Sequence, residues 1–359
     1  MRKFLFLVAA VAAAQTRPEE IRINQVQVLA SHNSYKQAID PALRTILRES
    51  MGDRLKGLEY NHRPFADQLD LGLRGLEIDV VYDPEGGRYA RPAGLAMVQE
   101  RPTPSGPSYD PQGLMRLPGF KVLHVPDIDF RTHAYTFQQA LSQLRAWSEK
   151  HPRHLPIVIT MNAKQSGVDR PGFVKPLPFD RAAYDAWDAE IRTALPAGKL
   201  ITPKSVQSGY ATLEAAARAH AWPTVDSSRG KFLFVLDEAK PQWELYLQGR
   251  ADRVMFVNVP EGHPEAAVRI VNEPRKNIGY IQRLVRSGYY VRTRSDADTR
   301  EARANDRTRF EAALESGAQL ISTDYYVPDP EIGNGFQINL APGWNPLLLP
   351  AFRPLPPIE

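Results

Sequence analysis

The chain has 359 residues, 45 basic and 41 acidic, for a formal charge of +4, and it contains no cysteine. This length fits two average domains of ~150 residues or one (β/α) barrel of ~250 residues with insertions. A hydrophobic fraction of 43% and a charged fraction of 24% exclude a disordered chain, a coiled coil and a multi-span membrane protein. The small charge predicts no nucleic-acid partner, and the lack of cysteine excludes disulfides and zinc–thiolate sites.

The first residues predict an export signal. Arg2 and Lys3 precede an apolar stretch over residues 4–14, which ends in alanines of the kind found at cleavage sites. The stretch is shorter than the roughly 20 apolar residues that cross a bilayer, and no lipid-anchoring cysteine follows it. We expect residues 1–14 to be a signal peptide, with a buried strand as the alternative, and the mature protein to be secreted or periplasmic. Residues 15–359 are expected to form one domain.

The rest of the chain alternates between strand-length apolar runs and helical patterns. The predicted strands are residues 26–30, 76–81, 120–125, 157–161, 232–236, 254–257, 289–292 and 319–322. The predicted helices are residues 137–150, 181–195, 213–220, 275–286 and 300–316. Strands that alternate with helices form parallel sheets, so we predict an α/β fold with a single closed (β/α)8 TIM-type barrel. Residues 199–202 could be a ninth strand or a loop.

Two segments interrupt this alternation. Residues 82–118 are rich in glycine and proline and follow the second strand, so they predict a long loop at the C-terminal face of the barrel, where such folds keep their active sites. Apolar side chains of this loop either touch a membrane or, as we expect, pack the loop down; they are Tyr89, Leu95, Met97 and Tyr109. Residues 327–359 form an irregular, proline-rich tail that we expect to pack on the outside.

A pair of acids lies in the second predicted strand. Alternate residues of a strand share a face, so Glu77 and Asp79 point the same way. Two carboxylates this close repel each other unless a cation lies between them. A divalent ion with oxygen ligands, Ca²⁺ or Mg²⁺, is the simplest solution. An arginine such as Arg74 or Arg292 would also offset the repulsion.

Two histidines lie at the ends of predicted strands. His32 follows the first strand, and His124 lies near the end of the third. Both would sit beside the acid pair, which suits general acid and base roles near neutral pH, although a single histidine there is often structural. We interpret the remaining histidines as solvated or structural: His62, His133, His151, His154, His220 and His263.

At these residues the sequence resembles the phosphoinositide-specific phospholipases C, and most closely their bacterial, secreted, calcium-dependent branch. The motifs that carry the resemblance are residues 30–35 (ASHNSY), 73–79 (LRGLEID), the strand that reaches His124, and residues 291–299, 305–306, 316–319 and 322–325. They span residues ~25 to ~330 in the family's order. Glycerophosphodiester phosphodiesterases share the barrel, the acids and the two histidines, so the motifs specify the superfamily better than the substrate.

The resemblance implies catalytic roles for His32 and His124, and calcium-ligand roles for Asn33, Glu77, Asp79 and Asn162. The family usually has a glutamate where this chain has Asn162. An amide keeps a carbonyl oxygen but loses a charge, so we expect calcium to bind more weakly. Water, Asp127 or Asp129 could fill the gap instead.

Further polar residues are expected to contact the substrate. Lys164 shares a strand face with Asn162 and is a candidate phosphate contact, or else a solvated loop lysine. Arg292 and Arg294 alternate on one strand and could bind a phosphate or inositol hydroxyls, with Asp324 orienting one of them.

We therefore expect a secreted, metal-dependent phosphodiesterase of phosphoinositide phospholipase C type. It would use two histidines and Ca²⁺, with Mg²⁺ less suited, on a phospholipid headgroup or related diester. It would touch membranes transiently and needs no obligate protein partner. The alternatives are a glycerophosphodiesterase-like enzyme on a deacylated diester, or a non-catalytic barrel that binds headgroups or sugars. A glycoside hydrolase would not need paired histidines.

Overall fold

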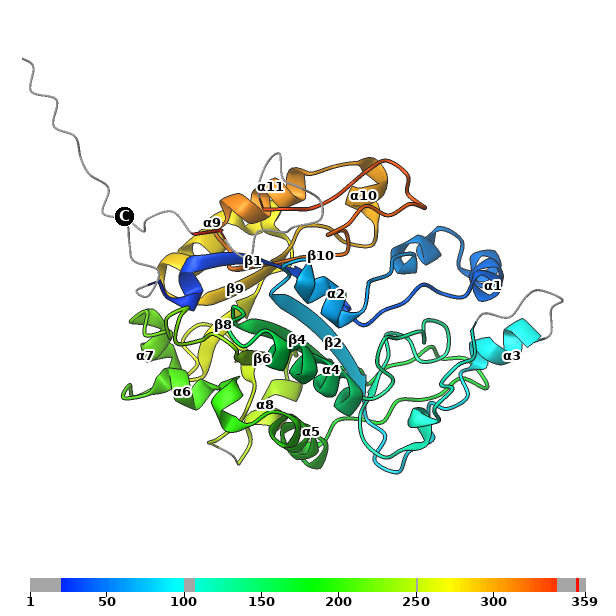
Figure 1. The fold of residues 1–359 in the computed structure, drawn as a ribbon, viewed down its shortest axis with the longest axis horizontal. Coiled ribbons are helices and arrows are strands. Elements are labelled where there is room, and N and C mark those ends of the chain that lie inside the picture. Colours follow the sequence, from blue (N-terminus) through cyan, green and yellow to red (C-terminus); the bar gives the residue numbers. More distant parts are fainter. Residues whose placement is uncertain (1–20, 100–106, 250, 341–352, 355–359) are drawn as a thin grey trace, which may run out of the picture.

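The computed structural model describes residues 21–99, 107–249, 251–340 and 353–354 (Figure 1). The expected signal peptide at residues 1–14 lies outside these residues, as do residues 341–352 and 355–359 of the expected tail. No helix within the described ranges is long and apolar enough to cross a membrane.

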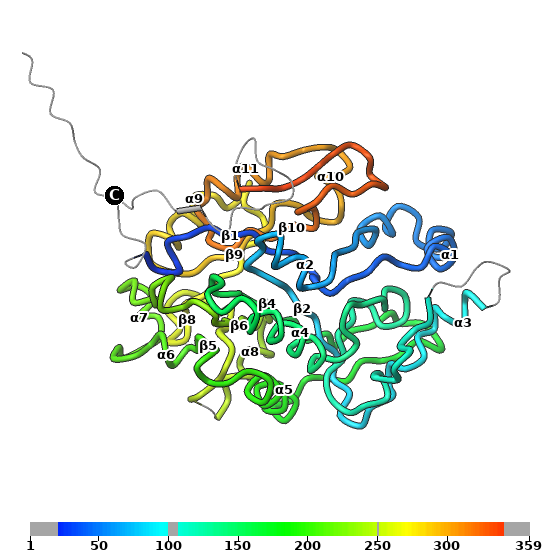
Figure 2. The backbone as a smooth tube through the Cα atoms, in the orientation of Figure 1, coloured from blue at the N-terminus to red at the C-terminus, as the bar shows by residue number. Residues whose placement is uncertain are grey.

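Eight parallel strands of the described chain close into a barrel, which confirms the predicted (β/α)8 fold. In barrel order they are β1 (Val26–Ser31), β2 (Gly75–Val81), β4 (Ile157–Ala163), β6 (Phe232–Leu236), β7 (Phe256–Asn258), β8 (Ala266–Ile270), β9 (Tyr290–Arg294) and β10 (Leu320–Thr323). Figure 2 shows β1 beside β10, although they lie at opposite ends of the sequence, and the register pairs Val28 with Leu320.

Helices surround this barrel (Figure 1). They are α1 (Pro41–Met51), α2 (Phe65–Asp70), α3 (Ala93–Gln99), α4 (Phe137–Lys150), α5 (Arg181–Ala194), α6 (Pro203–Gln207), α7 (Leu213–Arg218), α8 (Gln242–Leu247), α9 (Pro274–Arg286), α10 (Arg300–Ala304) and α11 (Thr308–Glu315). The α4 helix begins where the Thr136 hydroxyl accepts a hydrogen bond from the Gln139 amide at 3.1 Å. Its buried residues recur at helical spacing and face the strands.

One predicted barrel strand is wrong. Residues 120–125 contain only the two-residue strand β3 (Lys121–Val122), which pairs antiparallel with the end of β2 and lies outside the barrel. The eighth barrel strand is instead β8, which the sequence reading missed because it is short and interrupted by Arg269. It follows β7 through a connection without a helix in residues 259–265.

Residues 199–202, for which a ninth strand and a loop are the expected alternatives, contain the short strand β5 (Leu200–Ile201), which pairs parallel with β6. One helix boundary differs from the prediction. The helix predicted over 300–316 breaks into α10 and α11, because Asn305 adopts a left-handed backbone with φ of 52°. A further strand, β11 (Arg353–Pro354), pairs antiparallel with β1.

The alternation of β2 places the acid pair inside the barrel. Leu76, Ile78 and Val80 pack outward into the cluster that contains the buried faces of α4 and α5. Glu77 and Asp79, on the other face, therefore point inward. At the start of the same strand, Gly75 lies so close to β1 and β10 that an added Cβ would come within 2.5 Å of side chains on both strands.

The long loop and the tail contribute apolar packing. Tyr89 is buried, and Leu95, Met97 and Tyr109 pack against the cluster that includes Leu43 of α1. In the tail, the side chains of Phe336, Ile338 and Leu340 pack with Leu29 of β1 in a separate cluster.

Candidate active site

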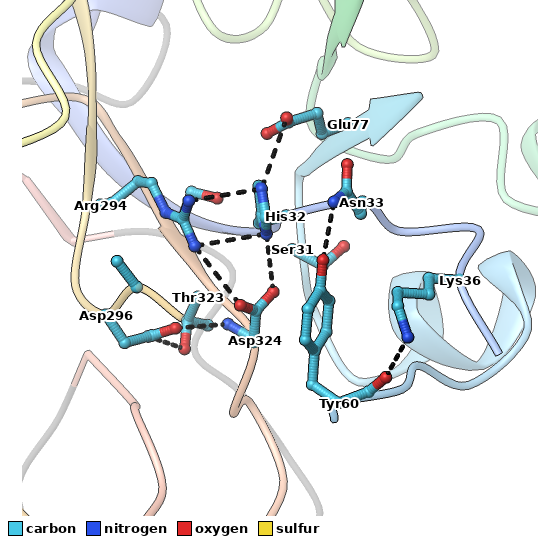
Figure 3. A network of polar contacts seen from close by, with 12 residues as sticks. Ser31, His32, Asn33, Lys36, Tyr60, Glu77, Arg294, Asp296, Thr323 and Asp324 are labelled. Atoms are coloured by element: carbon cyan, nitrogen blue, oxygen red, sulfur yellow. Dashed lines mark hydrogen bonds and ion pairs between the residues drawn. The ribbon is translucent and has the colours of Figure 1, made fainter. Parts of the chain in front are cut away.

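His32 stands at the centre of the polar residues at the barrel mouth (Figure 3). Its Nδ1 atom lies 3.0 Å from Oδ1 of Asp324, which follows β10, and its Nε2 atom lies 3.9 Å from Oε1 of Glu77. The Arg294 guanidinium, at the end of β9, lies 3.3 Å from Nε2. The Asp324 carboxylate accepts a hydrogen bond from the Nδ1–H group of His32. The other ring nitrogen, Nε2, therefore keeps its lone pair and faces Glu77 and Arg294.

Two buried acids stand behind this histidine. Burial alone would raise the pKa of Asp324, but the charge of His32 and hydrogen bonds from His32 and His62 hold it well below its ordinary value. Asp296 accepts the Asp324 amide at 2.9 Å and the Thr323 hydroxyl at 2.6 Å. Burial, and then the Asp324 charge, raise the pKa of Asp296. Asp324 is therefore the ionised partner that orients His32.

His124 has its own carboxylate partner. It follows β3 rather than ending a barrel strand, yet its Nδ1 atom lies 2.7 Å from Oδ2 of Asp129. Oδ1 of Asp129 forms an ion pair with Lys36 at 3.2 Å. His124 also lies near enough to Asp79 for its charge to lower the pKa of that carboxyl. Asp129 is therefore the hydrogen-bond partner of His124 and is not grouped with the acids of β2.

Glu77 and Asp79 each have a cationic partner. Arg292 of β9 donates to Oε2 of Glu77, and it also donates to Asn272 at 2.8 Å. Lys164 lies 2.8 Å from Oδ2 of Asp79. These ion pairs already offset the repulsion from which the sequence predicted a cation. Of the two arginines considered for this role, Arg292 fills it, whereas Arg74 donates to backbone carbonyls.

Asp79 is the more enclosed of the two acids. Tyr35 donates to its Oδ2 at 2.9 Å. Burial would raise the pKa of Asp79, but Lys164, His124 and the Tyr35 hydrogen bond together lower it. Lys164 is desolvated as well, yet the Asp79 charge raises its pKa above the ordinary value. The pair is therefore ionised near neutral pH.

The four predicted calcium ligands form a set of oxygen donors. Oε1 of Glu77 and Oδ1 of Asp79 converge on the Asn162 amide nitrogen, at 3.1 and 3.0 Å. The Asn33 nitrogen donates to Tyr60 at 2.7 Å, which leaves Asn33 Oδ1 buried with no hydrogen-bond partner among the described residues. Two carboxylate oxygens and a free amide oxygen suit Ca²⁺. The Asn162 amide would need to turn its oxygen toward the acids.

This set differs from a typical acidic cluster. Across the described part of the chain, no three His, Asp or Glu side chains are arranged to hold a metal ion. The residues therefore fit a divalent cation only if amides complete the coordination.

The arginines of β9 differ in their surroundings. The Arg292 side chain is 3% exposed and committed to Glu77, so it acts within the site and does not face solvent. Arg294 is more open, and its Nε atom has no hydrogen-bond partner among the described residues. Of Arg292, Arg294 and Lys164, the latter two therefore have the more exposed side chains.

Sequence reasoning missed three members of the site. Asp237 directly follows β6; burial raises its pKa, and it accepts a hydrogen bond from Asn258 at 3.1 Å. An acid after an apolar run was the signal that could have revealed it. His62, interpreted as solvated or structural, lies 3.5 Å from Asp324, and Tyr60 holds Asn33. Both come from the loop between α1 and α2, for which the sequence offered no signal.

The sequence profile of the family described as "Phosphoinositide phospholipase C, Ca2+-dependent" matches residues 21–346. Among solved structures, the chain is similar to a calcium-dependent phosphoinositol-specific phospholipase C from a Pseudomonas species, with 18% identity and a TM-score of 0.57 over 94% of this chain and 96% of that one. It is also similar to a Ca²⁺-dependent phosphatidylinositol-specific phospholipase C from Streptomyces antibioticus, with 18% identity and a TM-score of 0.51 over 87% of this chain and 96% of that one. A search of curated proteins found no match.

Proposed function

This chain belongs to the Ca²⁺-dependent phosphoinositide phospholipase C family, as the sequence resemblance predicted, and on that premise we propose that it cleaves the phosphodiester of an inositol phospholipid. The enzyme class, a phospholipase C-like phosphoric diester hydrolase, follows from the family. The observation that carries the proposal is that two imidazole–carboxylate pairs, His32–Asp324 and His124–Asp129, meet at the acid pair of β2.

The two histidines divide the proton transfers. When the inositol 2-hydroxyl attacks phosphorus, a new P–O bond forms and the hydroxyl proton passes to Nε2 of His32. The P–O bond to glycerol then breaks, and His124 donates a proton to the leaving oxygen. Diacylglycerol and a cyclic inositol phosphate are the products. Asp324 and Asp129 hold each ring by its Nδ1 atom, so the reactive nitrogen of each faces the mouth.

The cations of the site match the charge of a phosphodiester. Arg294 lies against His32, so a phosphate beside Nε2 would meet its guanidinium. Lys164 adds a second positive charge at the opposite acid. A calcium ion held by Asn33, Glu77, Asp79 and Asn162 would supply further positive charge at the phosphate.

A related diester is the second candidate. The same residues would cleave a deacylated glycerophosphodiester if water or the glycerol hydroxyl attacked instead.

We also propose that the protein is exported through residues 1–14 and meets lipid by transient surface contact.

The test is a panel of substrates with Ca²⁺, Mg²⁺ or chelator. Phosphatidylinositol vesicles, glycerophosphoinositol and phosphatidylcholine vesicles would each be incubated with the protein, and the phosphorus-containing products would be separated and identified by ³¹P NMR. We expect release from phosphatidylinositol, faster with Ca²⁺ than with Mg²⁺. Release from glycerophosphoinositol alone would favour the second candidate, and release from none of them would favour a binding protein.

A further inference from the structure

A lysine buried behind the active site has every ammonium proton engaged. Lys36 has an exposed fraction of 0% and follows β1 by five residues. Its Nζ atom donates to the carbonyls of Tyr60 at 2.7 Å, Leu58 at 2.9 Å and Gln37 at 3.4 Å, and it forms an ion pair with Oδ1 of Asp129 at 3.2 Å. Lysine has three donors, so none is left for a substrate.

One contact of Lys36 leads to His124. The Asp129 carboxylate lies between the ammonium and the imidazole, with Oδ1 toward Lys36 and Oδ2 at 2.7 Å from Nδ1 of His124. A buried carboxylate is costly unless a charge or hydrogen bonds compensate for its lost hydration. Lys36 provides that charge on one side of the carboxylate, and the other side accepts a hydrogen bond from Nδ1 of His124.

The other contacts lead to Asn33. The ammonium lies 4.6 Å from the centre of the Tyr60 ring and holds the carbonyl of the same residue (Figure 3). The Tyr60 hydroxyl accepts the Asn33 amide at 2.7 Å. That bond fixes the amide so that its oxygen, which has no partner among the described residues, points away from Tyr60. Asn33 also has a left-handed backbone with φ of 48°, which its neighbours must hold in place.

We propose that Lys36 is a positioning residue that sets two parts of the active site at once, His124 through Asp129 and Asn33 through Tyr60. The inference rests on the proposed function for its kinetic readout. A positioning role for Lys36 can be told from a purely structural role. If Lys36 positions the site, its loss should lower kcat even after correction for any loss of folded protein.

Lys121 supplies a matched control. It is also buried, with an exposed fraction of 0%; its Nζ atom donates to the Gly119 carbonyl at 3.1 Å and lies 3.3 Å from Asp83. Like Lys36, Lys121 is a buried lysine with backbone carbonyl and carboxylate partners, but it lies at the end of the long loop. Lys121→Met should lower the melting temperature and leave kcat per folded molecule within about twofold of wild type.

The test compares Lys36→Met, Asp129→Asn, the double variant and Lys121→Met. Lys36→Met leaves a buried carboxylate unpaired, and the double variant removes that charge, so its melting temperature should recover part of the loss. The kcat of Lys36→Met per folded molecule should lie about 10²-fold below wild type, with KM within about twofold, and the kcat of the double variant should stay low although its stability recovers, because the catalytic ring remains misplaced. If kcat recovers together with stability, or never fell, the proposal is wrong.

A spectroscopic arm does not depend on turnover. In protein labelled with ¹⁵N-histidine, the His124 Nδ1 proton should give a strongly deshielded ¹H signal, identified by its loss in His124→Ala. Lys36→Met and Asp129→Asn should each weaken or remove this signal, and Lys121→Met should keep it. An unchanged signal in folded Lys36→Met would overturn the proposal even if no substrate had been found.

Discussion

Nδ1 of His32 lies 3.0 Å from Oδ1 of Asp324, a carboxylate whose side chain is 1% exposed at the end of β10. His62 and Arg294 also approach this carboxylate, at 3.5 and 3.4 Å. Three donors therefore hold an ionised acid in one orientation. The acid in turn fixes His32 with its Nδ1 protonated and its Nε2 free, the form that can accept a proton.

Replacing Asp324 with asparagine should therefore slow catalysis. An amide can present its nitrogen to Nδ1, which favours the wrong tautomer of His32, and we expect kcat to fall roughly 10²–10⁴-fold. The change is measured from initial rates on phosphatidylinositol. Asp329→Asn, which alters an acid beyond the barrel mouth, is the control. Equal rates for Asp324→Asn and wild type would show that this acid does not govern His32.

If Asn162 is a calcium ligand, as we propose, its side chain should set how tightly the site holds the ion. Its amide nitrogen donates to both acids, and glutamate there would add a third negative charge. Asn162→Glu should bind Ca²⁺ more tightly than wild type, and Asn162→Ala more weakly. Calorimetric titration of the three proteins measures the affinities. Indistinguishable affinities would place the ion away from the β2 acids.

His154 should make stability depend on pH. Burial lowers its pKa from 6.5 to about 4. Its Nδ1 atom donates to the Leu155 carbonyl at 2.6 Å, and its Nε2 atom accepts the Ser148 hydroxyl at 2.8 Å. The unfolded chain binds the proton first, so stability is complete above pH ~6.5 and falls as the pH drops toward 4. Urea unfolding at pH 7.5, 6 and 5 should show this decline.

The His154→Gln variant isolates the contribution of that ring. Its unfolding free energy should fall less between pH 7.5 and 5 than that of wild type. The half-exposed His151, on the same side of the barrel, offers His151→Gln as the control, which should decline as wild type does. A parallel decline for wild type and His154→Gln would refute the assignment.

Gly75 should be intolerant of any side chain. An added Cβ would lie 2.5 Å from both Ala30 Cβ and Leu320 Cδ1, where three strands meet at the closure of the barrel. Overpacking of this kind costs about 1–3 kcal/mol, so Gly75→Ala should unfold at lower denaturant. Gly279→Ala, on α9 with open space around the position, should be neutral or stabilising. Unchanged stability in Gly75→Ala would contradict the observed closure.

The parts of the fold that sequence predicts well have strong local patterns. The α4 helix was predicted at its observed bounds because its apolar residues recur at helical spacing between polar ones. The β2 acids were placed on one face because apolar residues alternate with them. The β8 strand carried no such pattern, since two alanines and Arg269 make it only weakly apolar.

The site residues that lie on barrel strands or at strand ends were predictable. His32, Glu77 and Arg294 come from barrel strands or their ends, so the topology alone brings them together. The partners of His124 and Asn33, Asp129 and Tyr60, were not predictable, because loops supply them. Nothing in the local sequence shows that Lys36 is buried or that Asp129 serves His124, since both contacts depend on how distant segments pack.

In the proposed mechanism, His32 and His124 together cleave an inositol phosphodiester. A ³¹P NMR time course on phosphatidylinositol would compare wild type with His32→Ala and His124→Ala at matched concentrations of folded protein. We predict that wild type converts the lipid phosphorus signal into that of a cyclic inositol phosphate, and that each variant does so roughly 10²–10⁴-fold more slowly. Conversion by either variant at the wild-type rate would show that the replaced histidine is not needed for the cleavage.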